Sequence, residues 1–150
     1  MKFSRYSFAS RLAGEFLPRP IPSMPKTVLI VDDSAIVRRV LREFLRRHSE
    51  VDSFQEASDG REAIACVRQV RPDLIILDLS MPGMGGVRAA AELKHLAPEV
   101  PILLFSMHYA RAEEFGVDAV VSKVDGWRLL AERVRYFLAE STASSFTANS

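Results

Sequence analysis

The stretch VLIVDDS at residues 28–34 decides the fold of this chain, because an apolar run ends there in two acids and a serine. A similar arrangement, LIILDLS, returns at residues 74–80, and a third apolar run, AVV at residues 119–121, is closely followed by a lysine. Short, continuous apolar runs are typical of strands that are buried on both faces of a parallel sheet. We therefore expect a parallel sheet whose strands end in charged residues.

Four residues at these strand ends form the candidate site: Asp32, Asp33, Asp78 and Lys123. The carboxyl ends of parallel strands meet at one edge of a sheet, near a switch in strand order, so these side chains should share one pocket. Carboxylates about 4 Å apart repel by roughly 4 kcal/mol per pair at an effective dielectric near 20, and a cation is expected to neutralise them. Mg²⁺ fits because it prefers oxygen ligands, whereas no His/Cys cluster indicates zinc.

The rest of the chain alternates between strand and helix patterns. Candidate strands are Thr27–Val31, Val51–Ala57, Asp73–Leu77, Val100–Phe105 and Asp118–Val121. Candidate helices are Ser34–His48, a segment from Asp59 that ends at Pro72, Val87–Leu96, a short piece within Tyr109–Phe115, and Trp127–Ala139. This alternation predicts an α/β fold with a five-stranded parallel sheet covered by helices on both faces.

The bulk composition is ordinary for a soluble domain. The 150 residues carry a net charge of +1 and a single cysteine, Cys66, which excludes an internal disulfide and suits a reducing, cytoplasmic compartment. No apolar run approaches the roughly 20 residues of a membrane span. We expect a flexible, proline-rich leader at 1–25, one domain at 26–140 and a disordered tail at 141–150. Met24 is an alternative start of the chain.

Asp78 is the natural nucleophile of the candidate site, because a carboxylate can accept a phosphoryl group and later release it to water. Conversion to an acyl phosphate removes the charge of the carboxylate and adds about two negative charges, which Lys123 and Mg²⁺ would hold. Ser106, at the end of the fourth strand, can aim a hydroxyl at the same group.

These residues resemble the receiver domain of two-component response regulators. The matching motifs are Val31-Asp32-Asp33-Ser34, Leu77-Asp78-Leu79-Ser80-Met81-Pro82, Ser106 and Ser122-Lys123, within about Lys26–Ala139. The resemblance is to the stand-alone, chemotaxis-regulator-like type. It implies a flavodoxin-like doubly wound sheet of order 2-1-3-4-5, with the fourth helix shortened in this chain.

The resemblance also implies residue roles. Asp78 would be the phospho-acceptor, Lys123 would contact the phosphoryl group, and Ser106 would be the switch hydroxyl. Asp33 would bind Mg²⁺ directly, together with Asp78 and the backbone carbonyl of Ser80, and Asp32 would assist through water. The expected partners are a histidine kinase or phosphotransfer protein and a downstream protein target, with no direct nucleic-acid or membrane contact; a homodimer is left open.

The chain departs from the family pattern in ways that concern signalling. The family usually has an aromatic residue three positions before the lysine, where this chain has Val120. Coupling from site to surface is then either lost or rerouted through Tyr109 or Phe115. Val124 follows the lysine in place of the usual cis proline, and a trans bond is expected there.

Three functions compete on this sequence. The first is a signalling module phosphorylated on Asp78, and the second is a receiver-like binding module that works without phosphorylation, which Val120 and the shortened fourth helix suggest. An enzyme, such as an aspartyl phosphatase, ranks last because Leu79 and Ser80 follow Asp78, with no second acid two positions on. We therefore expect self-phosphotransfer and autodephosphorylation only.

Two further patterns concern the helices. An arginine run at Arg38, Arg39, Arg42, Arg46 and Arg47 is either a nucleic-acid patch or, as the near-zero net charge favours, a solvated helix face. Trp127 is expected to be a packing residue at the start of the last helix.

Overall fold

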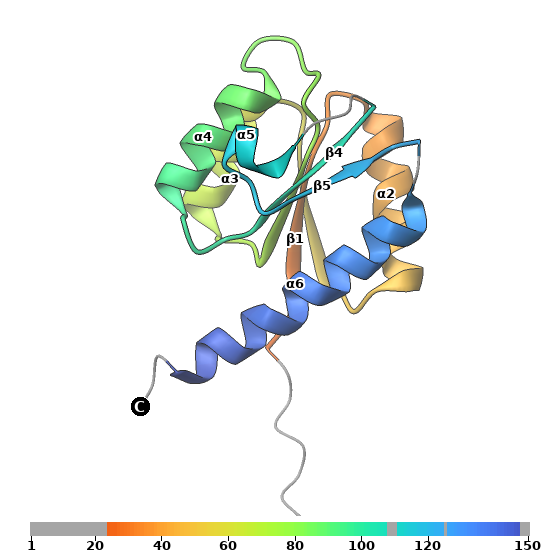
Figure 1. Cartoon of the computed structure of the whole chain (residues 1–150), viewed down its shortest axis with the longest axis vertical. Coiled ribbons are helices and arrows are strands. Elements are labelled where there is room, and N and C mark those ends of the chain that lie inside the picture. The colour runs from red at the N-terminus through yellow and green to blue at the C-terminus, as the bar shows by residue number, and fades with distance from the viewer. Residues whose placement is uncertain (1–23, 108–110, 125, 148–150) are drawn as a thin grey trace, which may run out of the picture.

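The computed structural model describes residues 24–107, 111–124 and 126–147, and within them five strands alternate with five helices (Figure 1). The strands are β1 (Thr27–Val31), β2 (Ser53–Ala57), β3 (Leu74–Leu77), β4 (Ile102–Ser106) and β5 (Ala119–Ser122). The helices are α2 (Ala35–His48), α3 (Gly60–Gln69), α4 (Gly86–Leu96), α5 (Ala112–Phe115) and α6 (Trp127–Thr147).

The sheet is parallel throughout, in the order β2-β1-β3-β4-β5, which confirms the predicted doubly wound topology. The order reverses between β1 and β3, where the chain crosses from one half of the sheet to the other. Val31 is aligned with Leu77 across that junction, so both strands end at the same level. The residues that follow them are therefore neighbours at the switch point, where open α/β sheets place their sites.

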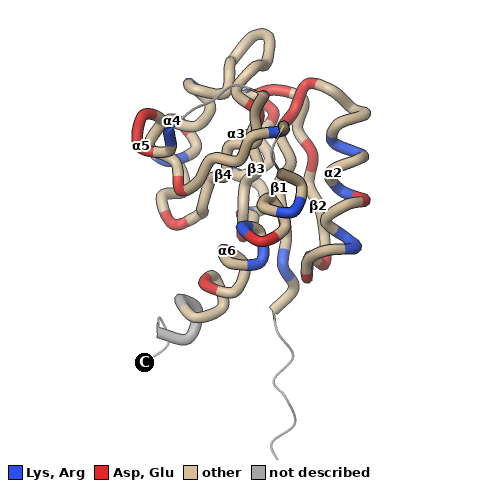
Figure 2. The backbone as a smooth tube through the Cα atoms, turned by 45° about the vertical axis from the view of Figure 1, so that its right-hand side comes forward, with Lys and Arg blue, Asp and Glu red and all other residues tan. Residues whose placement is uncertain are grey.

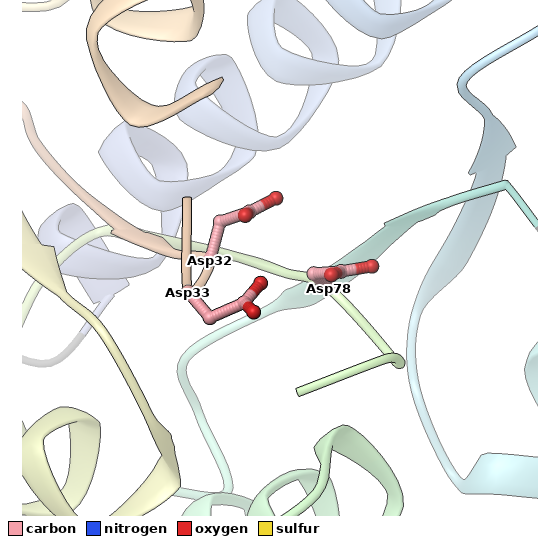
Figure 3. Close-up of side chains that lie close together, drawn as sticks. All are labelled: Asp32, Asp33 and Asp78. Atoms are coloured by element: carbon pink, nitrogen blue, oxygen red, sulfur yellow. The ribbon is translucent and has the colours of Figure 1, made fainter. Parts of the chain in front are cut away.

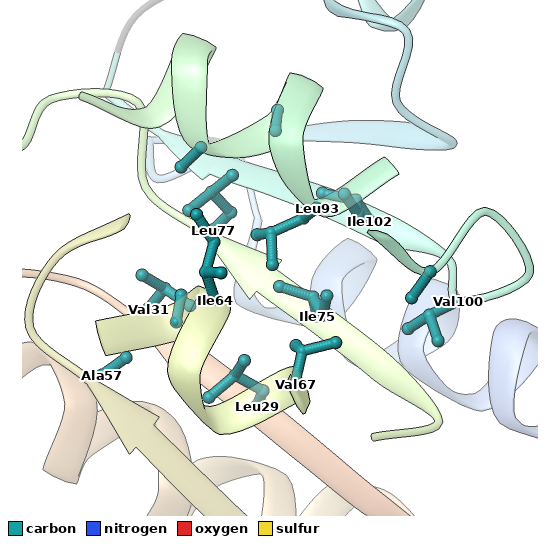
Figure 4. Packing of buried hydrophobic residues seen from close by; sticks show 14 of the residues in the cluster. Leu29, Val31, Ala57, Ile64, Val67, Ile75, Leu77, Leu93, Val100 and Ile102 are labelled. Atoms are coloured by element: carbon teal, nitrogen blue, oxygen red, sulfur yellow. The ribbon is translucent and has the colours of Figure 1, made fainter. Parts of the chain in front are cut away.

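The core consists of two layers, one on each face of the sheet. Alternate residues of each strand point to opposite faces. Leu29 and Ile75 belong to the cluster under α3 and α4 (Figure 4), whereas Val28 and Leu74 belong to the cluster under α2 and α6. Because both faces are covered, the central strands are apolar at nearly every position, which explains their continuous apolar runs in the sequence.

Two helices begin at side-chain caps. The hydroxyl of Ser34 accepts a hydrogen bond from the backbone N–H of Val37 at 3.3 Å, and Asp59 accepts one from the N–H of Glu62 at 2.9 Å. Such caps satisfy N–H groups that have no partner within the helix. The cap at Ser34 starts α2 directly after the acids that follow β1, so the acidic loop is held short.

The shortened fourth helix is also confirmed, since α5 spans four residues. It ends at Gly116, whose φ of 62° lies in the left-handed region that favours glycine. The predicted trans bond after Lys123 agrees with the structure, because none of the described peptide bonds is cis. Tyr109, one of the residues proposed for rerouting, lies outside the described residues.

The last helix is longer than predicted. A disordered tail was expected from Ser141, but α6 continues to Thr147 and extends beyond the body of the domain (Figure 1). Its continuation is tied to the sheet, because the hydroxyl of Ser141 donates to Asp73 Oδ1 at 3.0 Å and accepts from Lys26 Nζ at 3.3 Å. The prediction of disorder is therefore wrong for 141–147, while 148–150 and most of the predicted leader, 1–23, lie outside the described residues.

The arginines of α2 divide into two sets. Figure 2 shows basic residues spread along this helix. Arg38 and Arg42 bind Glu56 of β2, at 3.1 and 2.5 Å, so the prediction of a solvated face is wrong for these two. Arg39, Arg46 and Arg47 are exposed, as predicted for the whole run. No helix among the described segments has the length and apolar character needed to cross a bilayer.

Candidate functional site

The acids of the candidate site follow directly from the pairing of the central strands. The N–H of Asp32 donates to the carbonyl of Ala57 at 3.1 Å, and the N–H of Asp78 donates to the carbonyl of Val31 at 2.9 Å. The backbone ladder thus continues one residue past β1 and β3. These backbone hydrogen bonds therefore fix the positions of Asp32 and Asp78 at the edge of the sheet.

The structure brings Asp32, Asp33 and Asp78 together at the carboxyl edge of the sheet (Figure 3). One carboxylate oxygen of each lies within 4.8 Å of those of the other two. Asp32 and Asp78 are buried, with 3% and 7% of their surface exposed, whereas Asp33 is exposed. The cluster therefore combines two buried carboxylates with one that is exposed to solvent.

Lys123 completes the cluster, but its ammonium lies nearer to Asp32 than to Asp78. Lys123 Nζ is 2.9 Å from Asp32 Oδ2 and 3.6 Å from Asp78 Oδ1. Its backbone N–H donates to the carbonyl of Ser106 at 2.8 Å, so the pairing of β4 with β5 positions the lysine. One cation thus neutralises part of the charge of two buried carboxylates.

Asp32 accepts hydrogen bonds at both its side chain and its backbone, and one of the donors, Arg38, was not predicted as a site residue. Its Oδ1 accepts the N–H of Ser34 at 2.9 Å, and its backbone carbonyl accepts Arg38 Nη1 at 2.6 Å. Both carboxylate oxygens of Asp32 are therefore engaged, one by Ser34 and one by Lys123. Arg38 stood out in the sequence only as part of an arginine run, which gave no sign of this contact.

Burial raises the pKa of the Asp78 carboxyl above its ordinary value. Lys123 opposes that rise, and the charges of Asp32 and Asp33 add to it. A hydrogen bond from the Ser80 backbone also favours the carboxylate. Burial thus disfavours the charged form of this carboxyl, while Lys123 and the Ser80 backbone favour it.

The other predicted site residues, Ser106 and Ser80, differ in their exposure to solvent. Ser106 is fully buried at the end of β4, and Ser80 is exposed in the loop after β3. Met107, next to Ser106, is exposed at 63% of its surface. Of these residues, Ser106 is therefore buried within the sheet, whereas Ser80 and Met107 are open to solvent.

Gly86 is a second residue whose importance the sequence did not reveal. A Cβ built at this position would overlap the carbonyl oxygen of Asp78 and the Cα of Leu79. Its N–H donates to the carbonyl of Leu79 at 3.1 Å, so the start of α4 presses against the backbone that carries Asp78. Nothing in the sequence distinguishes Gly86 from the nearby Gly83 and Gly85, and only this contact shows its importance.

The donor set fits Mg²⁺. All three clustered side chains offer carboxylate oxygens, which are hard ligands, and the exposed Asp33 leaves one side of the pocket open to water. Mg²⁺ in proteins is usually held by one or two carboxylates and keeps several waters. The partial neutralisation by Lys123 leaves net negative charge in the pocket, which a divalent cation would offset.

Comparison with known proteins gives the family. The model of the response regulator receiver domain matches residues 28–135. The chain is also 34% identical over 113 residues to the response regulator protein VraR of Staphylococcus aureus, across 72% of this chain and 54% of that protein. This chain belongs to the response regulator receiver domain family, and it spans about half the length of the curated relatives it matches.

Solved structures agree with this assignment. A CheY-like receiver domain protein of Methanospirillum hungatei superimposes with a TM-score of 0.72, at 21% identity, over 81% of this chain and 99% of that one. The response regulator TrrA of Thermotoga maritima, in complex with Mg²⁺ and BeF, gives a TM-score of 0.67 at 29% identity, over 75% of this chain and 99% of that one. The first likeness concerns the fold alone.

Proposed function

We propose that this chain is a receiver that accepts a phosphoryl group on Asp78 from a histidine kinase or phosphotransfer protein, and signals through protein contacts in the cytoplasm. One observation carries the proposal. Asp78 is a buried carboxylate at the switch point of the sheet, within 3.6 Å of the Lys123 ammonium and clustered with two further acids. Such a group can attack phosphorus and have the added charge held nearby.

Each residue has a distinct task in this transfer. A carboxylate oxygen of Asp78 forms a bond to phosphorus as the bond between phosphorus and the donor's imidazole nitrogen breaks, and the nitrogen takes up a proton. Lys123 stabilises the phosphoryl oxygens by its charge, and Ser106, at the end of β4, would donate its hydroxyl to them. Release follows when water attacks phosphorus and regenerates the carboxylate.

Asp33, Asp78 and the carbonyl of Ser80 would hold Mg²⁺, with Asp32 assisting through water. The bound ion supplies charge neutralisation for a phosphoryl group that carries about two negative charges. The engagement of both Asp32 oxygens by Ser34 and Lys123 supports an indirect role for that acid. The exposure of Asp33 supports a direct one.

The test is phosphorylation by a small donor. Incubation with Mg²⁺ and acetyl phosphate should add one phosphoryl group, detected by intact-mass spectrometry, and Asp78→Asn should abolish the gain. Glu140→Gln is the control, because Glu140 is an exposed acid on α6, away from the carboxyl edge of the sheet. Equal labelling of Asp78→Asn and wild type would refute the assignment of the acceptor.

A binding module that works without phosphorylation is the second candidate. Val120 in the aromatic position and the four residues of α5 favour it. The absence of any mass gain at high donor concentration would support this reading. Turnover of many equivalents of a phosphoester per protein would instead indicate an enzyme, and light scattering would show whether two copies associate.

A further inference from the structure

Three aromatic side chains form a continuous line from the candidate site to the surface between α2 and α6. We call Phe105, Trp127 and Phe44 the aromatic array. The ring centroids of Phe105 and Trp127 are 5.5 Å apart at an interplanar angle of 76°, and those of Trp127 and Phe44 are 5.1 Å apart at 72°. Both are edge-to-face contacts, the geometry that aromatic pairs prefer. These contacts also confirm the prediction that Trp127 is a packing residue.

The inner end of the aromatic array touches the charge of the site. Lys123 Nζ lies 5.8 Å from the centroid of the Phe105 ring, within the range of a cation–π interaction. The same ammonium is bonded to Asp32 and faces Asp78. Phe105 is 1% exposed, so any change in the position of this ammonium acts on a ring that is closely packed.

The outer end of the aromatic array reaches the surface. The Phe44 ring lies 4.4 Å from the ring of His48, which is exposed at the end of α2. A hollow of about 350 Å³ adjoins these two rings; it is lined by Phe44, His48, Arg128, Ala131, Glu132 and Arg135. Arg135 Nη1 donates to the carbonyl of His48 at 2.6 Å, so the contact between α2 and α6 closes over the array.

Among residues 24–107, 111–124 and 126–147, no pair of aromatic rings is in contact on the opposite face of the sheet. Val120 is an aliphatic residue packed against the cluster under α3 and α4, and it has no ring to move. Phe115, one of the two residues expected to reroute the signal, packs against that same cluster. The aromatic array lies on the other face, and it connects the lysine of the site to two helices.

We propose that the aromatic array couples phosphorylation of Asp78 to the α2–α6 surface. The inference rests on the proposed function, because it requires Lys123 to turn toward a new phosphoryl group. That turn changes the cation–π contact with Phe105, and the edge contacts of Trp127 and Phe44 then repack. Phosphorylation accordingly changes the packing between α2 and α6.

The experiment uses Trp127 as the reporter, since it is the single tryptophan of the sequence. Beryllofluoride with Mg²⁺ mimics the phosphoryl group, and its occupancy is followed by ¹⁹F NMR independently of fluorescence. The expected result is a change in Trp127 emission that saturates together with occupancy and is absent in Asp78→Asn. Full occupancy without any change in Trp127 emission would overturn the inference and leave the proposed function standing.

Phe105→Leu tests the path, because it keeps an apolar side chain and removes the ring. The emission change should disappear, while beryllofluoride affinity shifts by about two- to fivefold, the equivalent of one cation–π contact. Phe137→Leu is the matched control, because Phe137 packs on the same face of the sheet and its ring contacts Tyr136. An unchanged emission response in Phe105→Leu would overturn the inference.

A second variant, Phe44→Leu, covers the case in which Phe105→Leu fails to fold. Phe44 is half-buried, and its ring contacts Trp127, so the site itself should be undisturbed. Beryllofluoride should change amide hydrogen exchange in α2 of the wild type, and Phe44→Leu should lose that change. If Phe44→Leu kept the change in hydrogen exchange in α2, the proposed coupling through the aromatic array would be overturned. Failure of the wild type to bind beryllofluoride at all would refute the proposed function and this inference together.

Discussion

The chemistry of the site depends on how one ammonium is shared between two buried carboxylates. Lys123 is 0.7 Å closer to Asp32 than to Asp78, as the distances of 2.9 and 3.6 Å show. Since Asp32 carries the stronger contact, Asp78 retains a poorly compensated charge. The residue expected to be the nucleophile is thus the less well paired of the two, which agrees with the raised pKa of its carboxyl.

Asp33→Asn should have opposite effects in the absence and presence of Mg²⁺. Without the metal, loss of one charge relieves repulsion within the 4.8 Å cluster, and the free energy of unfolding should rise by about 1 kcal/mol, the value for two charges about 4 Å apart in water, because Asp33 is exposed. With Mg²⁺, the wild type should gain stability and the variant should not, because binding to the native state stabilises it. Urea unfolding in EDTA and in Mg²⁺ measures both.

Glu140→Gln is the control, since Glu140 is an exposed acid on α6. It should leave the response to Mg²⁺ unchanged. An Asp33→Asn protein that Mg²⁺ still stabilises as much as the wild type would show that this acid is not a ligand.

The starts of the helices determine where the site residues lie. Glu62 at the start of α3 accepts hydrogen bonds from the backbone N–H and the hydroxyl of Ser58, at 2.7 and 2.6 Å. These bonds hold the pKa of the Glu62 carboxyl below its ordinary value of 4.5. The loop after β2 is thereby fastened to the helix that packs under the site.

Glu62→Gln should therefore destabilise the protein in a pH-dependent way. A depressed pKa in the folded state means that the carboxylate contributes stability above pH 4.5, and that this contribution is lost as the pH falls through the lowered value. At pH 7 the loss should be about 0.3–0.5 kcal/mol, at the low end for a helix cap because the group is exposed. Urea unfolding of the variant and wild type at pH 7 and pH 3 should show the difference only at pH 7; Glu114→Gln, on α5, should show none.

Gly86→Ala should distort the backbone at Asp78 and Leu79, just after β3. Its Cβ would overlap the backbone of Asp78 and Leu79, and relief requires a shift of α4 or of the loop. We expect a loss of about 1–3 kcal/mol in the free energy of unfolding, typical of overpacking, together with slower phosphorylation by acetyl phosphate. Gly85→Ala is the matched control, because its Cβ would meet only the carbonyl of Met81 at an ordinary 3.8 Å. Equal stability and phosphorylation rates for the two variants would contradict this account.

Sequence patterns predicted an element well where the pattern covers many residues, and poorly where a single tertiary contact determines the bounds of the element. The apolar runs of β1 and β3 fixed the sheet and the positions of the acids after them. The end of α6 could not be predicted, because the serine- and threonine-rich composition after Ala139 gives no sign of the bonds from Ser141 to Asp73 and Lys26. The contacts of the aromatic array could not be predicted either, because Phe105 is one apolar residue among several in the run at 102–105.

At the scale of the whole molecule, the two edges of the sheet have different tasks. The carboxyl edge carries the acidic cluster, and the amino edge holds the fold together. There Lys26, only 8% exposed, contacts Ser141 at 3.3 Å and Asp73 at 4.0 Å. Asp73 Oδ2 also accepts the N–H of Thr27 at 2.8 Å, so one small network joins β1, the start of β3 and the end of α6.

Ser141→Ala should destabilise the protein by about 1 kcal/mol, because it leaves the nearly buried Lys26 short of a hydrogen-bond partner. Thr142→Ala is the matched control. Its hydroxyl bonds the carbonyl of Leu138 within the same helix at 3.3 Å, and alanine favours helix, so it should be neutral or stabilising. Urea midpoints compare the two; a Ser141→Ala protein as stable as Thr142→Ala would show that the network does not hold α6.

The two outermost strands of the sheet have a consequence for behaviour in concentrated solution. β2 and β5 are only five and four residues long, and β2 carries Glu56, whose carboxylate is clasped by Arg38 and Arg42. Short rims that bear fixed charge are poor templates for adding a foreign strand. The β2 edge, both short and charged, is therefore a poor site for backbone pairing with another chain, whereas the β5 edge has only its shortness as protection.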